Sequence, residues 1–267
     1  MSRKPAVAGM FYPGKADELQ QQVDGFLEPT SDKQNAYAIM VPHAGYIYSG
    51  HVAGITFSSV KLPERFVILC PNHTWLGGTA AIMTEGSWRT PLGEAPIDSA
   101  LASEILRHSK ILCEDARAHT SEHSLEVQLP FLQRLRPDFR FVPISVRTHE
   151  PDDLQEIASA IAEVVDSSDN EVMLVASTDM THQESQKSAE RKDRLAIDEI
   201  ERLDPLKLLK VVKENDISMC GVAPTACVML AAKALGATKG QLLKYSTSAE
   251  TTGDYDRVVG YAGAMFV

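Results

Sequence analysis

The chain of 267 residues lacks the basic segments typical of nucleic-acid-binding proteins and the long apolar segments typical of membrane proteins. It has no Lys/Arg-rich segment, and its net charge of -10 opposes attraction to a phosphate backbone. No stretch approaches the roughly 18 to 20 uncharged apolar residues of a membrane-spanning helix. The first residues, MSRKPAVAGMFYPG, contain no apolar segment of secretory length. We therefore expect a cytoplasmic globular protein that binds neither nucleic acid nor membrane.

Cysteine is also scarce. The chain has four of them: Cys70, Cys113, Cys220 and Cys227. They form no CxxC pair and no regular framework, so reduced thiols are expected. Cys220 differs from the others because it precedes Gly221 and a helix expected to begin near Pro224, where a thiolate is favoured. The other three are expected to act as small hydrophobic residues.

Short apolar runs alternate with longer amphipathic segments along the chain. The runs predict strands at 36–42, 65–71, 79–85, 140–146, 171–177, 241–247 and 258–267. Helical spacing of apolar residues predicts helices at 16–28, 99–108, 122–135, 152–166, 188–201, 205–214 and 224–235. Nearly continuous apolar strands between helices predict an α/β fold, with a central, mostly parallel or mixed sheet flanked by helices. No repeat or change of composition divides the chain, so we expect a single domain over 1–267.

Histidines follow several of the expected strands by a few residues. They are His43, His73, His149 and His182. In open α/β sheets ligands bind beyond the carboxyl ends of the strands, where the loops converge. Any one of these histidines is explained equally well as a surface loop residue. Several at one sheet edge favour a metal site with an attendant general base, because imidazole binds metals and titrates near neutrality.

Other polar residues accompany these histidines. Asp179 lies three residues before His182 and is expected either in the site or at the cap of the next helix. In the segment SEHSLE, Glu122 and His123 are expected to lend polar groups to the pocket or to cap their own helix. This segment lacks the two-histidine spacing of a zinc protease helix. Tyr46 is expected either to wall the pocket or to pack in the core.

A series of motifs, taken in order, resembles one known family. The motifs are MFYPG, VPHAGYIYSG, PNHTW, TPLGE, SEHSLEVQLPFL, VPISV, STDMTH, CGVAP and VVGYAGAMF. They span essentially the whole chain and follow one another as in the Memo family, whose bacterial and archaeal members are called AmmeMemoRadiSam system protein B. The resemblance implies a fold similar to the class III extradiol, or LigB-like, dioxygenases. In those enzymes two histidines and a carboxylate hold a non-haem Fe(II).

The resemblance also implies roles for individual residues. It implies that one metal ion is held by His43, His73 and Cys220. It implies that His182 acts as a general acid/base and that Asp179 belongs to the pocket, whereas His149 has no counterpart in the family pattern. Since a thiolate in place of a carboxylate softens the site, Fe(II) is the first expectation and Cu or Zn are alternatives.

The function implied by the resemblance is a non-haem Fe(II)- or Cu-dependent redox enzyme with an unknown substrate. Its expected partners are a radical SAM protein and an AMMECR-type protein of the AmmeMemoRadiSam system. Two alternatives stay open: a binding or scaffold module that receives a peptide or protein in the same pocket, and a metal carrier. Because likeness of fold does not transmit chemistry, the sequence leaves enzymatic activity undecided.

Overall fold

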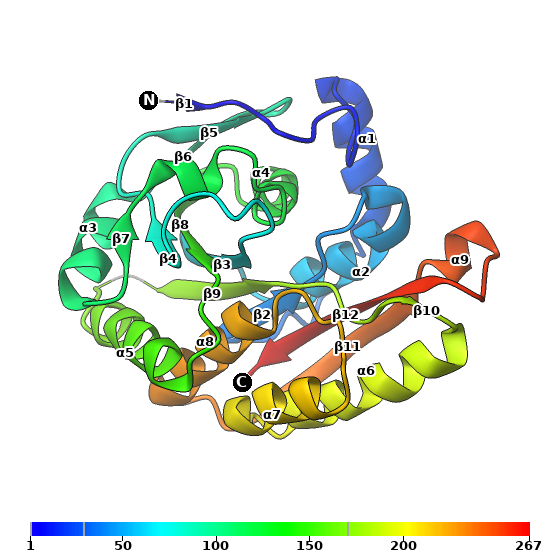
Figure 1. Ribbon diagram of the computed structural model, residues 1–267. Coiled ribbons are helices and arrows are strands. Elements are labelled where there is room, and N and C mark those ends of the chain that lie inside the picture. The colour runs from blue at the N-terminus through cyan, green and yellow to red at the C-terminus, as the bar shows by residue number, and fades with distance from the viewer. Residues whose placement is uncertain (1, 29, 170) are drawn as a thin grey trace.

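Parallel strands form the centre of the sheet in the computed structural model, which describes residues 2–28, 30–169 and 171–267 (Figure 1). In spatial order they are β2 (Ala38–Val41), β9 (Val172–Ser177), β3 (Arg65–Pro71) and β8 (Arg140–Val146). Nearly all of their residues are buried, which explains why the sequence reads as continuous apolar runs. Because these strands are parallel, their carboxyl ends meet at one edge of the sheet.

Further strands, most of them paired antiparallel, extend the sheet on both sides. On the β2 side lie β12 (Val258–Phe266), β11 (Gly240–Thr247) and β10 (His182–Glu184). On the β8 side lie β4 (Ala80–Ile82) and β7 (Cys113–Glu114). A separate small sheet contains β1 (Ser2–Arg3), β5 (Ser87–Thr90) and β6 (Gly93–Pro96). The prediction of an α/β fold with a mixed central sheet is therefore confirmed.

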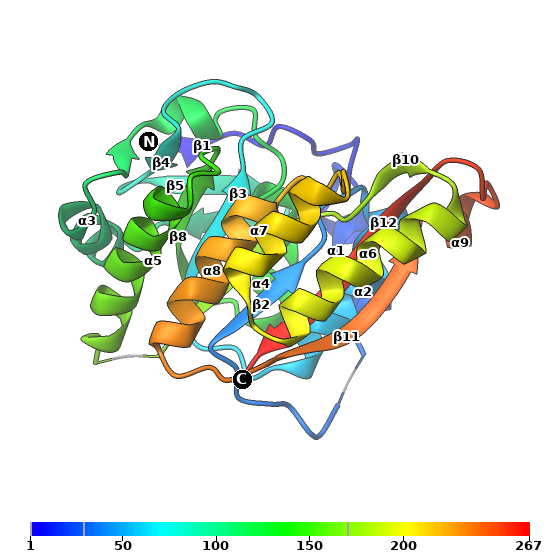
Figure 2. The ribbon, with the colours of Figure 1, turned by 60° about the horizontal axis from the view of Figure 1, so that its bottom comes forward.

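Helices cover both faces of the sheet. One face carries α3 (Ser99–His108), α5 (Pro151–Asp166), α6 (Gln186–Glu201), α7 (Pro205–Glu214) and α8 (Val222–Ala234), most of which stand in front of the strands in Figure 2. The other carries α1 (Ala16–Phe26), α2 (Tyr46–Ser59) and α4 (Leu129–Leu135). Shorter turns are η1 (Ala116–His119), η2 (Glu126–Gln128) and α9 (Ala249–Thr252). In the described ranges, no helix combines the length and apolar character needed to cross a bilayer.

Local sequence explains where two of the helices begin. The Asp98 side chain accepts a hydrogen bond from the Leu101 N–H at 3.1 Å and so caps α3. Asp204 caps α7 in the same way through the Lys207 N–H at 3.1 Å, and Pro205 occupies the first helical position. These caps satisfy N–H groups that have no partner within the helix.

The structure differs from the predicted helices in two places. No helix is predicted over 46–59, yet α2 forms there, because it is buried on several sides and shows no amphipathic stripe. The helix predicted over 122–135 is replaced by η2 followed by the shorter α4. The residues before η2 leave helical geometry because the Glu122 carboxylate turns inward to accept hydrogen bonds.

Candidate metal centre

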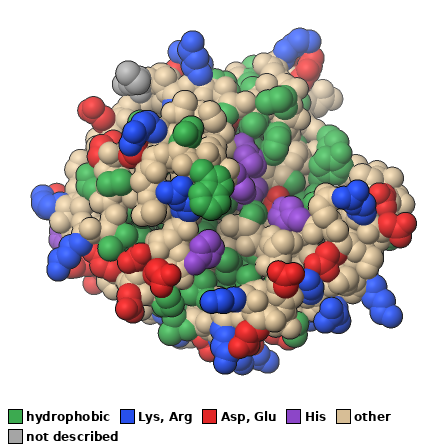
Figure 3. All heavy atoms as spheres, in the orientation of Figure 1, with side chains coloured by type: hydrophobic (Ala, Val, Ile, Leu, Met, Phe, Trp, Pro, Cys, Tyr) green, Lys and Arg blue, Asp and Glu red, His purple; other side chains and the backbone are tan. Residues whose placement is uncertain are grey.

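Three polar side chains lie just beyond the carboxyl ends of β2, β9 and β3, at the same edge of the sheet. His43, Asp179 and His73 each lie two residues beyond the last residue of their strand. His43 and Asp179 are almost fully buried, at 2% and 4% exposure. In the space-filling view, histidine side chains gather near the middle of the face, beside hydrophobic side chains (Figure 3). The expectation that strand-end histidines converge is met for His43 and His73.

Three imidazoles meet at this edge. His43, His73 and His123 each offer one ring nitrogen, and these nitrogens lie within 4.8 Å of one another. The rings of His43 and His73 are nearly perpendicular with centroids 5.3 Å apart, whereas His73 and His123 stack at 4.9 Å. His123 comes from the loop before η2 and adds a donor to the ligands implied by the family resemblance. The cluster is able to hold a metal ion, since imidazole nitrogen is a common ligand for Zn, Cu and Fe.

Hydrogen bonds fix the tautomer of His43. The Ser177 hydroxyl donates to the Ser124 carbonyl at 2.6 Å, so it has no second proton to give to the ring. Its oxygen therefore accepts from Nδ1 of His43 at 3.0 Å, and also from the Gln128 amide at 2.9 Å. Nδ1 of His43 carries the proton, and the lone pair of Nε2 faces the centre.

A buried carboxylate orients His73 in the same sense. Glu122 is fully buried; its Oε1 accepts from Nδ1 of His73 at 2.9 Å, and its Oε2 accepts from the His73 backbone N–H at 2.6 Å. Ser124 donates to the same carboxylate through its backbone N–H at 2.9 Å and its hydroxyl at 2.6 Å. This carboxylate–imidazole pair leaves Nε2 of His73 free, as in many metal sites.

Electrostatics favour neutral rings at His43 and His123 but a charged ring at His73, which must lose a proton before it binds a metal. Burial raises the pKa of Glu122, but the hydrogen bond and charge of His73 and the bonds from Ser124 outweigh it and lower the pKa to about 2. Burial lowers the pKa of His73, but the bond and charge of Glu122 outweigh it and raise the pKa overall. Burial lowers the pKa of His43 well below its usual value, and the neighbouring histidines lower it further. Burial also lowers the pKa of His123. Neutral imidazoles are the form that binds metals.

Cys220 lies against His43 in the loop before α8. Its sulfur is 3.2 Å from Nε2 of His43 and accepts the Asp179 backbone N–H at 3.3 Å. Burial and then the charge of Asp179 raise the pKa of Cys220. These two effects disfavour the expected thiolate and oppose the influence of the helix end. The thiol has two acceptors within reach, Nε2 of His43 at 3.2 Å and the Asp179 carbonyl oxygen at 3.7 Å.

Asp179 and His182 lie on the β9 and β10 side of the cluster. Oδ1 of Asp179 accepts the His43 backbone N–H at 2.7 Å, and its Oδ2 lies 4.0 Å from Nε2 of His43. Burial raises the pKa of Asp179 to about 6, although the backbone bond from His43 opposes this. Nδ1 of His182 donates to the Ser218 carbonyl at 3.0 Å, and the His182 backbone N–H donates to the Ser218 hydroxyl at 2.7 Å. The other ring nitrogen of His182 is left available.

Tyr46 and His149 occupy other surroundings. The Tyr46 ring is buried against Tyr12 and Phe131, and its hydroxyl donates to the Val127 carbonyl at 2.6 Å. Tyr46 therefore supports η2 from the core. Of the two roles expected for it, a pocket wall or packing in the core, its position corresponds to the second. His149 is exposed beyond β8.

Residues that the sequence did not single out hold the site in place. Ser177, Ser124 and Gln128 fix His43, and the Phe11 ring packs against His123 with centroids 4.7 Å apart. One signal was present: Ser177 is a polar residue at the end of an otherwise apolar strand. Nothing local marks Gln128, because its partner Ser177 lies 49 residues away in the chain.

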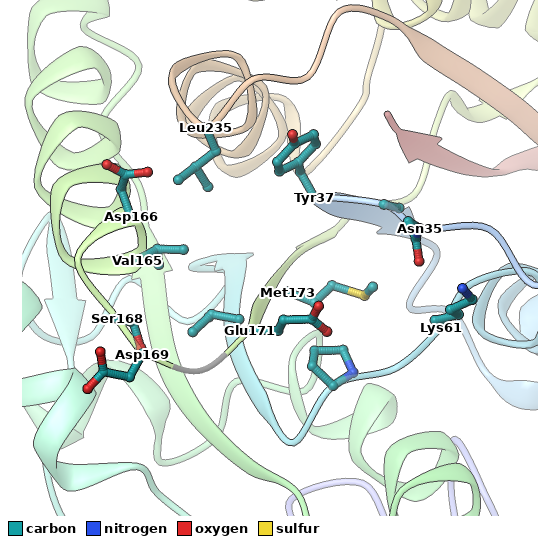
Figure 4. Close-up of a pocket in the computed structure, with 13 residues that line it drawn as sticks. Asn35, Tyr37, Lys61, Val165, Asp166, Ser168, Asp169, Glu171, Met173 and Leu235 are labelled. Carbon is teal, nitrogen blue, oxygen red and sulfur yellow. The ribbon is translucent and has the colours of Figure 1, made fainter.

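A cavity of about 530 Å³ lies at the opposite edge of the sheet, near the amino ends of β2 and β9 (Figure 4). Charged side chains at this cavity include Lys61, Asp166, Asp169 and Glu171. Its described lining contains neither histidine nor cysteine. The cavity therefore offers none of the nitrogen and sulfur donors found at the histidine cluster.

Comparisons with known proteins give a consistent result. A family described as "Memo-like protein" matches residues 3–265. A MEMO1 family protein of Methanopyrus kandleri is 44% identical over 280 residues, covering 100% of this chain and 99% of the relative. One from Aquifex aeolicus is 42% identical over 269 residues, covering 99% of each chain. The crystal structure of an uncharacterized Escherichia coli K12 protein aligns with a TM-score of 0.57 at 15% identity, over 85% of this chain and 98% of that one. That last likeness concerns the fold alone.

Proposed function

The chain belongs to the Memo-like protein family, and from this premise we propose that it is a metal-dependent redox enzyme. The observation that carries the proposal is the pair of fixed tautomers. Ser177 and Glu122 hold the Nδ1 protons of His43 and His73, so that both Nε2 lone pairs face one centre. The proposed cofactor is one Fe(II) ion, with Cu or Zn as alternatives.

The donor set fits such an ion. His43 and His73 are the first two proposed ligands, and Cys220 is the third, as the family resemblance implies. The sulfur of Cys220 lies 3.2 Å from Nε2 of His43. His123 is a competing donor, because one of its ring nitrogens belongs to the same cluster. Metal binding requires the Cys220 thiol to lose its proton, which the charge of the ion favours. When bound, Fe(II) or Cu supplies electron transfer and Lewis acidity at this edge.

The chain's own residues manage protons around that centre. His182 is proposed as the general acid/base, because one ring nitrogen is held by Ser218 and the other is available. Asp179 is proposed to share this role, since burial brings its pKa to about 6, close to the working range of a proton carrier. Both groups come from the segment that follows β9.

Metal loading under anaerobic conditions tests the proposal. Purified protein is incubated with Fe(II), Cu(I) or Zn(II), and bound metal is counted by elemental analysis. One ion per chain is expected, and His43→Ala and His73→Ala should lose it. His149→Ala, which changes an exposed histidine, serves as the control. A chain that stays metal-free after all three loadings overturns the proposal. His182→Gln should retain the metal and lose oxygen consumption in assays with candidate substrates.

A metal carrier is the second candidate, and the position of Cys220 favours it. A sulfur 3.2 Å from an imidazole nitrogen gives a soft donor pair that suits Cu(I). Rapid metal exchange without oxygen consumption would support a carrier. A scaffold role predicts instead that substitutions at the histidines leave partner binding intact. We propose a radical SAM protein and an AMMECR-type protein as partners on the strength of the family resemblance, and co-purification after joint expression tests them.

A further inference from the structure

An exposed tryptophan stands at the rim of the metal centre. Trp75 lies two residues after His73 and is 74% exposed, and its neighbour Leu76 is 49% exposed. The backbone φ of Trp75 is 60°, a left-handed conformation that bulky residues rarely adopt. Such strain persists only where the surrounding structure imposes it, and it concentrates at functional sites.

The loop around Trp75 imposes this conformation through its own hydrogen bonds. Oδ1 of Asn72 accepts from the backbone N–H and the hydroxyl of Thr74 at 3.1 and 3.0 Å. The Asn72 amide donates to the Leu76 carbonyl at 2.8 Å, and the Leu76 N–H donates to the Thr74 hydroxyl at 3.3 Å. Bonds on both sides therefore hold the Trp75 ring outward, toward solvent.

An arginine from the neighbouring strand meets this ring. Arg147 directly follows β8, which pairs with β3, so it reaches the same sheet edge as His73. Its guanidinium carbon lies 5.2 Å from the centroid of the Trp75 ring, and its Nη1 donates to the Trp75 carbonyl at 3.1 Å. Within the described ranges Arg147 takes part in no ion pair. The carboxylate that binds this loop, Asp115, is paired with Arg117 instead.

We propose that Trp75 and Arg147 bind a small ligand of this site that has a planar ring carrying a carboxylate. The face of an exposed indole stacks on a planar ring, and a guanidinium binds a carboxylate through paired hydrogen bonds. The two side chains are already joined, so little freedom is lost when such a ligand binds. The proposal rests on the proposed function in one respect: the ligand is taken to be that of the metal centre.

Fluorine NMR tests this directly, because the chain has two tryptophans and the other, Trp88, is fully buried. The full chain, labelled with 5-fluorotryptophan, is titrated with 2-naphthoate, neutral 2-naphthamide and acetate. Naphthoate should shift the Trp75 resonance and leave that of Trp88 unchanged. It should bind about tenfold or more tightly than naphthamide, the ratio expected for a hydrogen bond to a charged group. Equal affinities for naphthoate and naphthamide would overturn the proposal.

Matched variants assign the preference to its residues, with binding followed by ligand-observed NMR. Arg147→Gln should bring naphthoate and naphthamide to within about twofold of each other. Arg107→Gln removes an exposed arginine that pairs with Glu104 and should keep the full preference. Trp75→Leu should weaken both aromatic probes and bring naphthoate close to the affinity of acetate. If Arg147→Gln behaves like Arg107→Gln, the proposal fails.

Titrations with and without bound metal separate this proposal from the proposed function. Metal uptake without a preference for naphthoate contradicts the role of Trp75 and Arg147 alone. A preference in a protein that takes up no metal supports that role and contradicts the metal-dependent enzyme. Thermal unfolding of each variant confirms that a lost signal reflects the binding site and not loss of fold.

Discussion

The sulfur of Cys220 lies 3.2 Å from Nε2 of His43, the nitrogen whose lone pair the bond to Ser177 leaves free. Burial and the charge of Asp179 raise the pKa of this thiol and so favour the protonated sulfur. The proposed role of Cys220 as a ligand beside Nε2 therefore requires that the thiol lose its proton when a metal binds.

Replacing Cys220 tests whether the sulfur is the third ligand. Cys220→Ser should lower Cu(I) affinity by more than about 100-fold, the upper end of what losing a ligand-orienting residue costs. The loss for Fe(II) should be smaller, because Fe(II) depends less on a soft donor. His123→Gln is the matched variant at the competing donor. Competition against a chelator measures the metal affinity of both variants. If Cys220→Ser keeps its Cu(I) affinity and His123→Gln loses much of it, His123 is the third ligand.

Glu122→Gln should weaken the hold on His73. Because this carboxylate fixes the His73 ring, its loss should lower metal affinity by about 10- to 100-fold. The folded pKa of about 2 lies below the usual 4.5, so the stabilisation from Glu122 is present above pH 4.5 and is lost as pH falls toward 2. The free energy of unfolding of Glu122→Gln, measured in urea, should therefore change less between pH 4.5 and 2 than that of the parent. Glu163→Gln, at a 70% exposed carboxylate, should leave both measurements as in the parent.

The sequence located the strands of this site better than the loops. The runs predicted at 65–71 and 140–146 coincide with β3 and β8, because a buried parallel strand is apolar throughout. The strand-end positions of His43 and His73 follow from the same pattern. The sequence did not reveal that Glu122 turns inward to His73, since that contact joins residues 49 positions apart. It also missed α2, whose burial on several sides removes the periodicity on which helix prediction depends.

His119, a buried histidine outside the three-histidine cluster, should also make stability depend on pH. Its ring is fully buried beside Trp88, and burial and the charge of Arg3 lower its pKa from 6.5 to about 4. The unfolded chain therefore binds more protons below pH 6.5, and stability should fall as pH drops from 6.5 to about 4. The titration of His119 should change the free energy of unfolding by up to about 3 kcal/mol between these two pH values.

His119→Phe removes the titrating group and keeps an aromatic ring. The difference in unfolding free energy between parent and variant, measured in urea at several pH values, should shrink in the acid direction. His149→Gln, at an exposed histidine, should follow the parent at every pH. Parallel curves for the parent and His119→Phe would show that His119 does not stay neutral in the fold.

A buried ion pair fastens the N-terminal segment that brings Phe11 to His123. Arg3 Nη1 lies 2.6 Å from Oε2 of Glu126, and both side chains are nearly or fully buried. Glu126 also accepts the Tyr12 hydroxyl at 2.5 Å, so one carboxylate holds both ends of this segment. Removing the charge of the Glu126 carboxylate leaves the buried guanidinium of Arg3 without its counter-charge.

Glu126→Gln should therefore destabilise the fold by about 3–5 kcal/mol, the usual range for breaking a buried pair. Hydrogen exchange over 3–12 should increase more than in the central strands. Arg134→Gln breaks an exposed pair with Asp24 and should cost less than about 1 kcal/mol. Equal effects of the two substitutions would mean that the buried pair contributes no more than a surface one.

Two glycines, each preceding a helix of the site, give a matched pair for testing how closely the Cys220 loop must approach β9. A Cβ on Gly221 would lie 2.5 Å from both the Ser177 carbonyl oxygen and Cβ of Thr178, whereas a Cβ on Gly45 meets nothing closer than 3.7 Å. Both are N-cap residues, of α8 and α2, so the cost of alanine at a cap is common to the two variants.

Gly221→Ala should push the Cys220 loop away from the end of β9 and lower stability by about 1–3 kcal/mol more than Gly45→Ala does. The displacement should also separate the thiol from Nε2 of His43, so metal affinity should fall in Gly221→Ala and not in Gly45→Ala. Urea unfolding and chelator competition measure the two effects. If Gly221→Ala loses stability but binds metal as before, either the loop yields without moving Cys220 or the sulfur is not a ligand; the metal affinity of Cys220→Ser decides between the two.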